Sequence, residues 1–382
     1  MGTAYLVDAV RTPIGRRNGS LAAIHPVELG AIPLRALVAR TGIPTDAIED
    51  VIFGCVTPVG EQGANVGRLC ALEAGFPVST TGVQVNRMCG SGQQAVHFAA
   101  MGVASGFQDL VIAGGVEVMS RVPMGSDMFL DGEMARFSSE LSWHYTIIPQ
   151  GNSAELVAKK YGLTRAELDA YSYESHRRAG AALDAGWADV EFAAVDHAGG
   201  KLARDEGVRR DTSVAKLGSL KPAFQEDGVI TAGSSSQISD GAAALLLASE
   251  AAVKRYGLKP RARIVSATTA GVDPTIMLTA PVPATRRALA KAGLSVDDLD
   301  AIEINEAFAS VALGCGRELG FDFAKTNVYG GAIANGHPLG ASGAKLMTTL
   351  LNVLEKTGGR YGLQTMCIGF GQATATVIDT NV

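Results

Sequence analysis

Cys89 lies in the segment 83–96, where an alternating apolar strand pattern runs into a glycine-rich turn and then into a helix pattern. The N-terminus of a helix offers free backbone N–H groups and the positive end of the helix dipole, and both favour a thiolate over a thiol. An ordinary thiol titrates at about pH 8.5, so this help matters to a nucleophile. Most free cysteines are small buried apolar residues, however, and Cys89 alone does not decide between the two interpretations.

A second segment supplies a base for such a nucleophile. His337 stands in the glycine-rich turn 330–343, which is predicted to open a helix at about Ala341. Of the six histidines, it alone has flanking glycines that let other groups approach closely. We expect it to accept the thiol proton of Cys89 and later to donate a hydrogen bond to a substrate oxygen. A lone histidine is more often structural, but this setting favours the catalytic interpretation.

Two further strand ends carry polar or nucleophilic side chains. Asn305 follows a buried strand pattern, and its amide is suited to hold a water or to donate to an oxyanion, although a turn-capping role is the alternative. Cys367 ends the strand pattern before Gly369. Two cysteines, one histidine and one amide at equivalent strand ends indicate one shared site.

The composition limits the class of protein. A chain of 382 residues is too long for one ordinary core, so two or more domains are expected. With 47% hydrophobic and 19% charged residues it fits a large α/β protein, and a net charge of −5 argues against nucleic acid as a partner. Five cysteines without a CxxC pair argue against a disulfide framework and a zinc site, and they favour a reducing compartment: Cys55, Cys70, Cys89, Cys315 and Cys367.

No targeting or membrane segment is apparent. The N-terminus enters a strand pattern directly, without the layout of a signal peptide, and no apolar run approaches the length of a membrane span. We therefore expect a cytoplasmic protein that contacts neither a membrane nor nucleic acid.

The chain contains a weak internal duplication. Segments 42–53 and 293–304 match in their apolar and acidic positions, and each reads as a helix end, a glycine stop, a turn and a strand. An early strand precedes both copies, at 4–9 and at 262–267. Two similar α/β halves are the simplest account.

A stretch of different character, roughly 120–239, separates the halves. It contains several methionines, both tryptophans and a charged helical pattern around 159–178. Long ordered insertions are usually functional, so we expect this one to cover the site and shape a pocket, with a structural or subunit-contact arm as the alternative. The predicted domains are an N-terminal half at 1–119 that continues at about 240–260, an inserted loop domain at 120–239 and a C-terminal half at 261–382.

The motifs together resemble the thiolase family of acyl-CoA C-acyltransferases, and the resemblance covers nearly the whole chain. The matching segments are 89–92 (CGSG), 305–309 (NEAFA), 336–340 (GHPLG) and 367–369 (CIG). The family fold implies two βαβαβαββ halves stacked into five αβαβα layers, with a loop domain inserted in the first half. The implied activity is CoA-dependent cleavage of a 3-ketoacyl-CoA to acetyl-CoA and a shortened acyl-CoA, reversible as a Claisen condensation.

The resemblance also implies roles for the site residues. Cys89 carries the acyl group as a thioester, His337 activates it, and Cys367 acts as acid and base on the α-carbon of acetyl-CoA. One oxyanion hole uses His337 and a water on Asn305, and the other uses the backbone N–H groups of Cys89 and Gly369. No metal and no permanently bound cofactor is implied, and coenzyme A enters as a substrate. Coenzyme A contacts are implied for segment 231–243, including Ser236 and Ile238, and for Arg209, Met277 and Phe308.

Three departures from the family pattern bear on the substrate. Phe370 stands where a glycine is usual and is expected to narrow the site or perturb the second oxyanion hole. Leu278 and Ala280 also replace glycines and are expected to crowd the pantetheine channel or reshape the acyl pocket. Pro149 and Gln150 occupy the place of a His-Met pair found in short-chain biosynthetic members, which favours a degradative thiolase, such as those of fatty-acid or sterol breakdown.

The alternatives are an acetoacetyl-CoA-specific acetyltransferase, a carrier-protein-dependent ketosynthase and a non-catalytic acyl-CoA-binding homologue. Cys367 argues against the ketosynthase, which needs His or Asn there. The four retained site residues argue against the non-catalytic homologue. The family resemblance further implies a homodimer or homotetramer.

Overall fold

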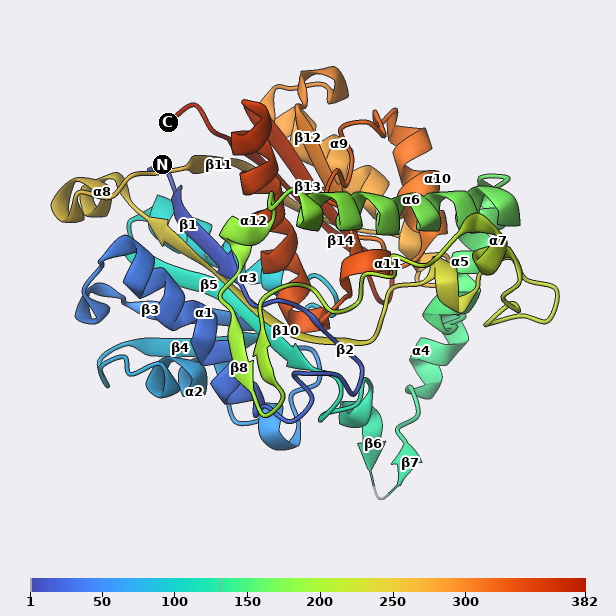
Figure 1. The fold of residues 1–382 in the computed structure, drawn as a ribbon, viewed down its shortest axis with the longest axis horizontal. Helices are drawn as coiled ribbons and strands as arrows, with labels where there is room; N and C mark the ends of the chain where they lie inside the picture. Colours follow the sequence, from blue (N-terminus) through green and yellow to red (C-terminus); the bar gives the residue numbers. More distant parts are fainter. Residues whose placement is uncertain (1, 131) are drawn as a thin grey trace.

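Two α/β units with the same order of elements make up most of the chain (Figure 1). The structure is a computed structural model that describes residues 2–130 and 132–382. The first unit consists of β1 (Tyr5–Arg11), α1 (Pro26–Thr41), β3 (Asp50–Gly54), α2 (Val66–Glu73), β4 (Thr81–Val85), α3 (Ser91–Ser105), β5 (Leu110–Val118) and β10 (Ser239–Ala248). The second consists of β11 (Ala262–Gly271), α9 (Pro281–Ala292), β12 (Ala301–Ile304), α10 (Ala309–Leu319), α12 (Leu339–Thr357), β13 (Tyr361–Ile368) and β14 (Gln372–Asp379).

The duplication predicted from the sequence is therefore confirmed, with one difference. In the second unit, the strand equivalent to β4 is reduced to a single parallel bridge between Thr326 and Ile302. Every other strand and helix of the first unit has its counterpart in the second, in the same order.

The strands form one mixed sheet in the order β12-β13-β14-β11-β1-β10-β5-β3-β4, with the short β2 (Gly15–Arg16) paired to β10. The two halves of this sheet meet where β1 pairs antiparallel with β11, through only Tyr5–Arg263 and Leu6–Ala262. Each half pairs neighbouring parallel strands, β3 with β4 and β5 in the first and β12 with β13 in the second. Parallel strands place their carboxyl ends on one edge, which is where the predicted site residues follow them.

Helices α3 and α12 lie between the two halves of the sheet and form the middle layer (Figure 1). Helix α12 is buried from Leu339 to Leu354, as expected for a helix with sheet on both sides. From α3, the Gln93 amide donates to the Gln364 carbonyl in β13 at 3.3 Å, and His97 Nε2 lies 2.7 Å from Thr376 Oγ1 in β14. Helices α1 and α2 cover the outer face of one half of the sheet, and α9 and α10 cover the outer face of the other. Two outer helix layers, two sheet layers and the middle helix layer give the five predicted layers, which are confirmed.

The two central helices cross closely because their first turns carry glycine. A Cβ on Gly343 would overlap the backbone nitrogen of Gln93, so only glycine lets α12 approach α3 there. The Gly-rich sequence at 340–343 is thus required by packing in the middle layer as well as by the turn that holds His337.

The region between β5 and β10 consists of helices and small hairpins. Its elements are β6 (Phe129–Leu130), β7 (Glu133–Met134), α4 (Ser139–His144), α5 (Gln150–Lys160), α6 (Arg165–Asp184), β8 (Val195–His197), β9 (Gly200–Leu202) and α7 (Val214–Gly218). The helical pattern predicted around 159–178 corresponds to the end of α5 and most of α6. Elsewhere are α8 (Glu250–Tyr256), α11 (Ala332–Asn335) and short 3₁₀ turns at Thr45–Ala47, Gly60–Gln62, Ser126–Met128, Asp189–Glu191, Ala232–Ser234, Met277–Thr279 and Val296–Asp298. No helix among the described residues is long and apolar enough to cross a membrane.

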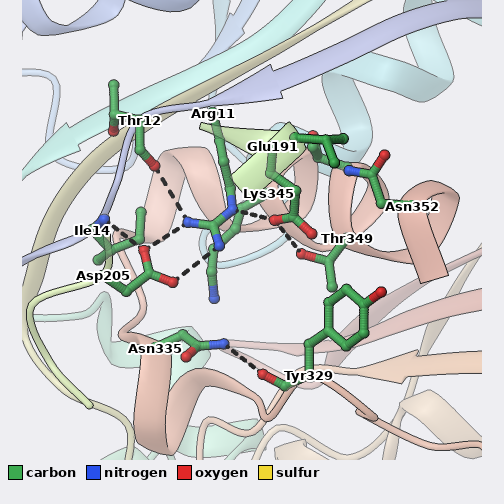
Figure 2. Close-up of polar contacts among 12 residues, drawn as sticks. Arg11, Thr12, Ile14, Glu191, Asp205, Tyr329, Asn335, Lys345, Thr349 and Asn352 are labelled. Atoms are coloured by element: carbon green, nitrogen blue, oxygen red, sulfur yellow. Dashed lines mark hydrogen bonds and ion pairs between the residues drawn. The ribbon is translucent and has the colours of Figure 1, made fainter. Parts of the chain in front are cut away.

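A buried charge cluster fastens the inserted region to both halves (Figure 2). Arg11, at the end of β1, pairs with Glu191 at 2.6 Å and with Asp205 at 2.7 Å, and both carboxylates belong to the inserted region. Thr349 of α12 donates to Glu191 at 3.0 Å, and the backbone nitrogen of Ile14 donates to Asp205 at 2.8 Å. The cluster therefore connects the first half of the chain, the inserted region and α12 of the second half.

Replacing Arg11 with methionine is expected to destabilise the fold strongly, because two buried carboxylates lose their counter-charge. Breaking a buried pair from one side typically costs about 3–5 kcal/mol of unfolding free energy. A urea denaturation series read by circular dichroism measures the loss. The matched control is Arg16→Met, since Arg16 is 67% exposed and 3.6 Å from Glu206, and its loss should cost within about 1 kcal/mol. Equal midpoints for the two variants would contradict a structural role of the cluster.

Candidate active site

Four loop or strand-end segments bring the predicted catalytic residues together in the middle of the molecule. Cys89 follows β4, Asn305 follows β12, His337 precedes α12, and Cys367 is the penultimate residue of β13. All four side chains are buried. Because they come from both halves of the duplication, the site exists only when the two halves are packed together.

The turn that carries Cys89 packs against the end of β13. Met88 adopts a left-handed backbone with φ of 45°, and Gly90 is the N-cap of α3. A Cβ on Gly90 would overlap the side chain of Ile368, so glycine allows the turn to approach the strand that carries Cys367. The sequence thus predicts correctly that Cys89 lies at a strand-to-helix corner.

The protonation state of Cys89 differs from the sequence-based expectation. Burial raises the pKa of the Cys89 thiol to about 11, although its own backbone N–H, the Gln150 side chain and the backbone N–H of Gly369 each lower it. Desolvation of the charged form outweighs the hydrogen bonds that favour a thiolate. Cys89 is therefore a thiol at neutral pH: the turn favours a thiolate, as the sequence predicts, but burial outweighs this effect.

His337 is oriented by a serine on the first turn of α12. Its Nδ1 lies 2.5 Å from Ser342 Oγ, and that hydroxyl donates to the Pro338 carbonyl at 2.8 Å. Since the serine hydrogen is already used, we assign Nδ1 as the donor, which leaves Nε2 with its lone pair facing the site. Helix α12 begins at Leu339, two residues before the start predicted from the sequence.

Asn305 lies against the free nitrogen of His337. Its Nδ2 is 3.4 Å from His337 Nε2, consistent with a donor facing a lone pair. Its Oδ1 is buried and has no hydrogen-bond partner among the described residues. This oxygen is free to accept from a water or a ligand, which fits the predicted role of Asn305 in holding a water.

The surroundings of His337 disfavour the protonated, positively charged form of its imidazole. Burial and, to a smaller extent, the nearby Lys345 ammonium together lower the pKa of His337 to about 3. Lys345 is itself buried and donates from Nζ to the Gly336 carbonyl, 3.2 Å away, directly before His337 (Figure 2 shows this lysine beside Arg11). Cys89 is thus a thiol and His337 a neutral imidazole, so a proton passes between them during the reaction rather than before it.

Cys367 is close enough to Cys89 for their charges to interact. Burial, followed by Cys89 and Cys315, raises the pKa of Cys367 well above its usual value. It is therefore a thiol at neutral pH and is suited to donate a proton. Phe370 has a φ of 60°, a conformation unusual for an aromatic residue, and its ring meets Phe137 edge-on with centroids 5.9 Å apart. The Gly369 N–H nevertheless reaches Cys89, so Phe370 does not displace this donor.

A cleft of about 1080 Å³ leads to the site from the inserted region. Of the five residues predicted to contact coenzyme A, four line it: Arg209, Ser236, Ile238 and Phe308. The segment around Ser236 is held to the NEAFA segment by a hydrogen bond from the Ser236 N–H to the Ala307 carbonyl at 2.9 Å. His337 lines the inner end, together with Met119 and Leu339, which also pack against Cys89.

Three residues expected near the ligand are buried in the C-terminal core instead. Met277, Leu278 and Ala280 are at most 2% exposed and are not among the residues that line the cleft. They form and follow a 3₁₀ turn that packs on α5 and β13, so their side chains fill the core. The expectation that Leu278 and Ala280 crowd the channel is not met, because neither faces it.

The cleft contains charged residues that the sequence analysis did not single out. Arg16, Arg17 and Arg210 line it along with Arg209, beside Glu206 and Asp211. The two pairs of adjacent arginines, 16–17 and 209–210, can be seen in the sequence of this acidic chain and could have suggested an anion-binding site. Nothing in the sequence, however, indicates that the two pairs lie close together. Gln150 also lines the cleft, and its contact with Cys89 was not predicted.

Comparison with known proteins agrees with this geometry. The family description "Thiolase, N-terminal domain" matches residues 4–251, and "Thiolase, C-terminal domain" matches residues 258–380. The chain is 50% identical to the steroid 3-ketoacyl-CoA thiolase FadA6 of Mycobacterium tuberculosis, over 99% of this chain and 94% of that protein. It is 44% identical to a beta-ketoadipyl-CoA thiolase of Acinetobacter baylyi and 43% identical to the 3-oxoadipyl-CoA/3-oxo-5,6-dehydrosuberyl-CoA thiolase of Escherichia coli K12, over 99% of this chain and 100% of each.

The two family matches divide the chain close to the junction between its duplicated halves and together cover the residues of the site. Similarity extends over the inserted region as well, since the relatives align along almost their entire length. By its fold, its site and these matches, the chain belongs to the thiolase family of acyltransferases.

Proposed function

We propose that the protein cleaves a 3-ketoacyl-CoA with coenzyme A, using Cys89 as the nucleophile, His337 as its base and Cys367 as the acid and base at the α-carbon. The observation that carries this is the grouping of these residues beside one large cleft. His337 lines the cleft and lies 3.4 Å from Asn305 Nδ2, while Cys89 packs against Met119 and Leu339 of the cleft wall and interacts with Cys367. Acyl transfer with carbon–carbon cleavage needs a nucleophile and a separate proton donor for the carbon that leaves.

In the first half of the reaction, Cys89 Sγ attacks the 3-keto carbon while its proton moves to His337 Nε2. The bond between C2 and C3 breaks, the acyl group remains on sulfur as a thioester, and the electron pair stays on C2 as the enolate of acetyl-CoA. Cys367 protonates C2, and acetyl-CoA leaves. A water on Asn305 and the protonated His337 stabilise the enolate oxygen.

In the second half, free coenzyme A attacks the thioester carbonyl. Before this step the proton on His337 passes to the Cys367 thiolate, which leaves the imidazole neutral and restores that thiol. His337 then takes the thiol proton of coenzyme A, and the bond to Cys89 Sγ breaks as the shortened acyl-CoA forms. The backbone N–H groups of Cys89 and Gly369, which already approach Cys89 Sγ, stabilise the oxyanion. The proton that His337 took from coenzyme A then passes to the Cys89 thiolate, so each turnover ends with both thiols restored.

The cleft suits coenzyme A. Its four arginines provide cations for the phosphates in the nucleotide part of coenzyme A. Two of these arginines follow β1, and the other two belong to the inserted region. Toward the site the lining becomes apolar at Met119, Ile238 and Leu339, which suits the pantetheine arm and the acyl chain. Coenzyme A is a substrate in this scheme, and no permanently bound group is required.

We infer an acyl chain longer or bulkier than that of acetoacetyl-CoA. Pro149 and Gln150 line the cleft, and Met119 and Met124 add adaptable apolar surface. The relatives are named for steroid and ketoadipyl substrates, which are also larger than acetoacetyl-CoA. Five free and buried cysteines suit a reducing compartment, and we place the reaction in the cytoplasm.

The test is a thiolysis assay that follows the absorbance of the magnesium–3-ketoacyl-CoA complex. It compares kcat/KM for acetoacetyl-CoA, a medium straight-chain 3-ketoacyl-CoA and a ring-bearing one. Each buried methylene is worth about 0.8 kcal/mol, or roughly fourfold, so a longer chain should raise kcat/KM clearly. A preference for acetoacetyl-CoA would make the protein an acetyl-CoA acetyltransferase, and no thiolysis of any substrate would refute the proposal.

We further propose that the protein works as a homo-oligomer, at least a dimer. Strand β4 is the last strand at its end of the sheet, and the adjoining surface exposes large apolar side chains, among them Val83, Phe98 and Met101. An unpaired edge beside exposed apolar residues is suited to pair with a second copy.

Replacing Val83 with aspartate is expected to separate the subunits, because it places a charge on this edge. Light scattering coupled to size-exclusion chromatography measures the mass of the particle at micromolar concentration. Val214→Asp is the control, since Val214 is similarly exposed but lies on α7 in the inserted region. A monomeric parent protein, or an unchanged mass for Val83→Asp, would count against this surface.

A further inference from the structure

Gln150 brings the inserted region into contact with the nucleophile. It is the first residue of α5, directly after Pro149, and its half-buried side chain lines the inner part of the cleft. Cys89 is only 5% exposed and packs against Met119 and Leu339 of the same cleft wall. The side chain of Gln150 therefore stands where a ligand in the cleft meets the buried sulfur.

The amide of Gln150 is one of three polar groups that favour a negative charge on Cys89 Sγ. Together with the backbone N–H groups of Cys89 and Gly369, it lowers the pKa of the Cys89 thiol. The distance between Gln150 and Gly369 also supports this placement. A Cβ added to Gly369 would lie 3.2 Å from Gln150 Nε2. The amide nitrogen thus lies directly against the residue that supplies the second backbone donor.

The start of α5 is held firmly enough to keep this contact. Glu155, on the second turn, accepts hydrogen bonds from the backbone of Val229 and Ile230, each at 2.9 Å. Ser310 of α10 donates to the Ala154 carbonyl at 3.0 Å. These bonds tie the helix to the segment before β10 and to the helix that follows Asn305. Because the start of α5 is fixed in this way, the Gln150 side chain loses little conformational entropy when its amide acts as a hydrogen-bond donor.

We propose that Gln150 is a catalytic residue whose side-chain N–H stabilises the negative charge on Cys89 Sγ, both when Cys89 attacks the substrate and when it leaves the thioester. The proposal extends the proposed function by assigning one more group to the same site. Because the charge on sulfur exists whenever the thiol ionises, the contact is testable without any substrate.

The structure explains why such a donor is useful here. Burial raises the pKa of Cys89 to about 11, and the Gln150 hydrogen bond is one of three contacts that oppose this rise. Two other groups that interact with the sulfur do not stabilise its negative charge: the Glu117 carboxylate raises the pKa of Cys89, and Cys367 is a thiol. Of the three donors, Gln150 alone uses a side chain, so it alone can be removed by substitution.

The experiment measures how fast iodoacetamide alkylates Cys89 in the full-length protein, read by peptide mass spectrometry between pH 7 and pH 10. In this probe reaction the Cys89 thiolate attacks the methylene carbon, and iodide leaves. Gln150→Met keeps the size of the side chain and removes the donor, and a charge-assisted hydrogen bond is worth about tenfold in the ionisation constant. Since a more basic thiolate is also more nucleophilic, alkylation at pH 8 should fall by about threefold to tenfold.

Two further variants make the result specific. Gln150→Glu places a carboxylate next to the sulfur, so its alkylation should be slower than that of Gln150→Met. Asn152→Ala is the matched control, because Asn152 lies on the same turn of α5 and its amide donates instead to the Phe224 carbonyl at 3.5 Å. It should leave the alkylation rate unchanged.

An alkylation rate in Gln150→Met equal to that of the parent protein, or equally lowered in Asn152→Ala, would overturn the proposal. The outcome is independent of the thiolase assignment, since a protein without thiolysis still reports the effect of Gln150 on Cys89. If the thiolase assignment also holds, Gln150→Met should lower kcat for thiolysis by a similar factor while the KM for coenzyme A stays near that of the parent.

Discussion

Cys89→Ala is expected to abolish thiolysis and to leave no covalent intermediate. Without the sulfur no thioester can form, and the remaining groups provide only binding and an oxyanion hole. Loss of a nucleophile in such a constellation typically costs about 10⁴-fold or more in kcat. Because Cys89 is a small buried side chain beside Met119 and Leu339, alanine should change the packing little.

Peptide mass spectrometry checks the assignment directly. After incubation of the parent protein with an acyl-CoA, the peptide that contains Cys89 should carry the added mass of the acyl group. In Cys89→Ala this mass should be absent from every peptide. An acyl group found on Cys367 in the parent protein would reverse the roles of the two cysteines.

Cys367→Ala is expected to separate acylation from turnover. Transfer of an acetyl group from acetyl-CoA to Cys89 breaks only the thioester bond, so it needs His337 and the backbone donors but no proton at carbon. Cleavage of a 3-ketoacyl-CoA needs that proton, and the high pKa of Cys367 keeps it available as a thiol. Loss of a general acid or base typically costs about 10²–10⁴-fold, which should appear in kcat for thiolysis.

The measurement pairs two readouts on the same variant: acetyl-Cys89 by mass spectrometry and thiolysis by absorbance. Cys315→Ala is the control, because Cys315 is equally buried but faces the Leu278 carbonyl at 3.6 Å, outside the cleft. It should retain thiolysis within a few-fold. Near-normal thiolysis in Cys367→Ala would remove this cysteine from the mechanism.

The family and the duplicated α/β architecture could be predicted from the sequence, and so could the four catalytic candidates. These depend on local patterns: glycines where a turn must pass close to another chain segment, polar residues directly after apolar strands, and the same order of elements in both halves. These patterns can be recognised without knowledge of the packing, because neighbouring residues in the chain determine where a strand ends or a helix starts. The start of α12, predicted at about Ala341 and found at Leu339, shows the usual uncertainty of such boundaries.

The protonation state of Cys89 and the residues around the cleft depend on how the chain packs, and they could not be predicted from the sequence. The helix start beside Cys89 favours a thiolate, but the depth of burial, which raises its pKa to about 11, depends on residues far away in the chain. The same holds for Met277, Leu278 and Ala280, which were expected near the ligand but pack in the core. Gln150 reaches Cys89 and Arg11 reaches Asp205 only because the inserted region folds back over both halves, and contacts between distant segments leave no pattern in a single sequence.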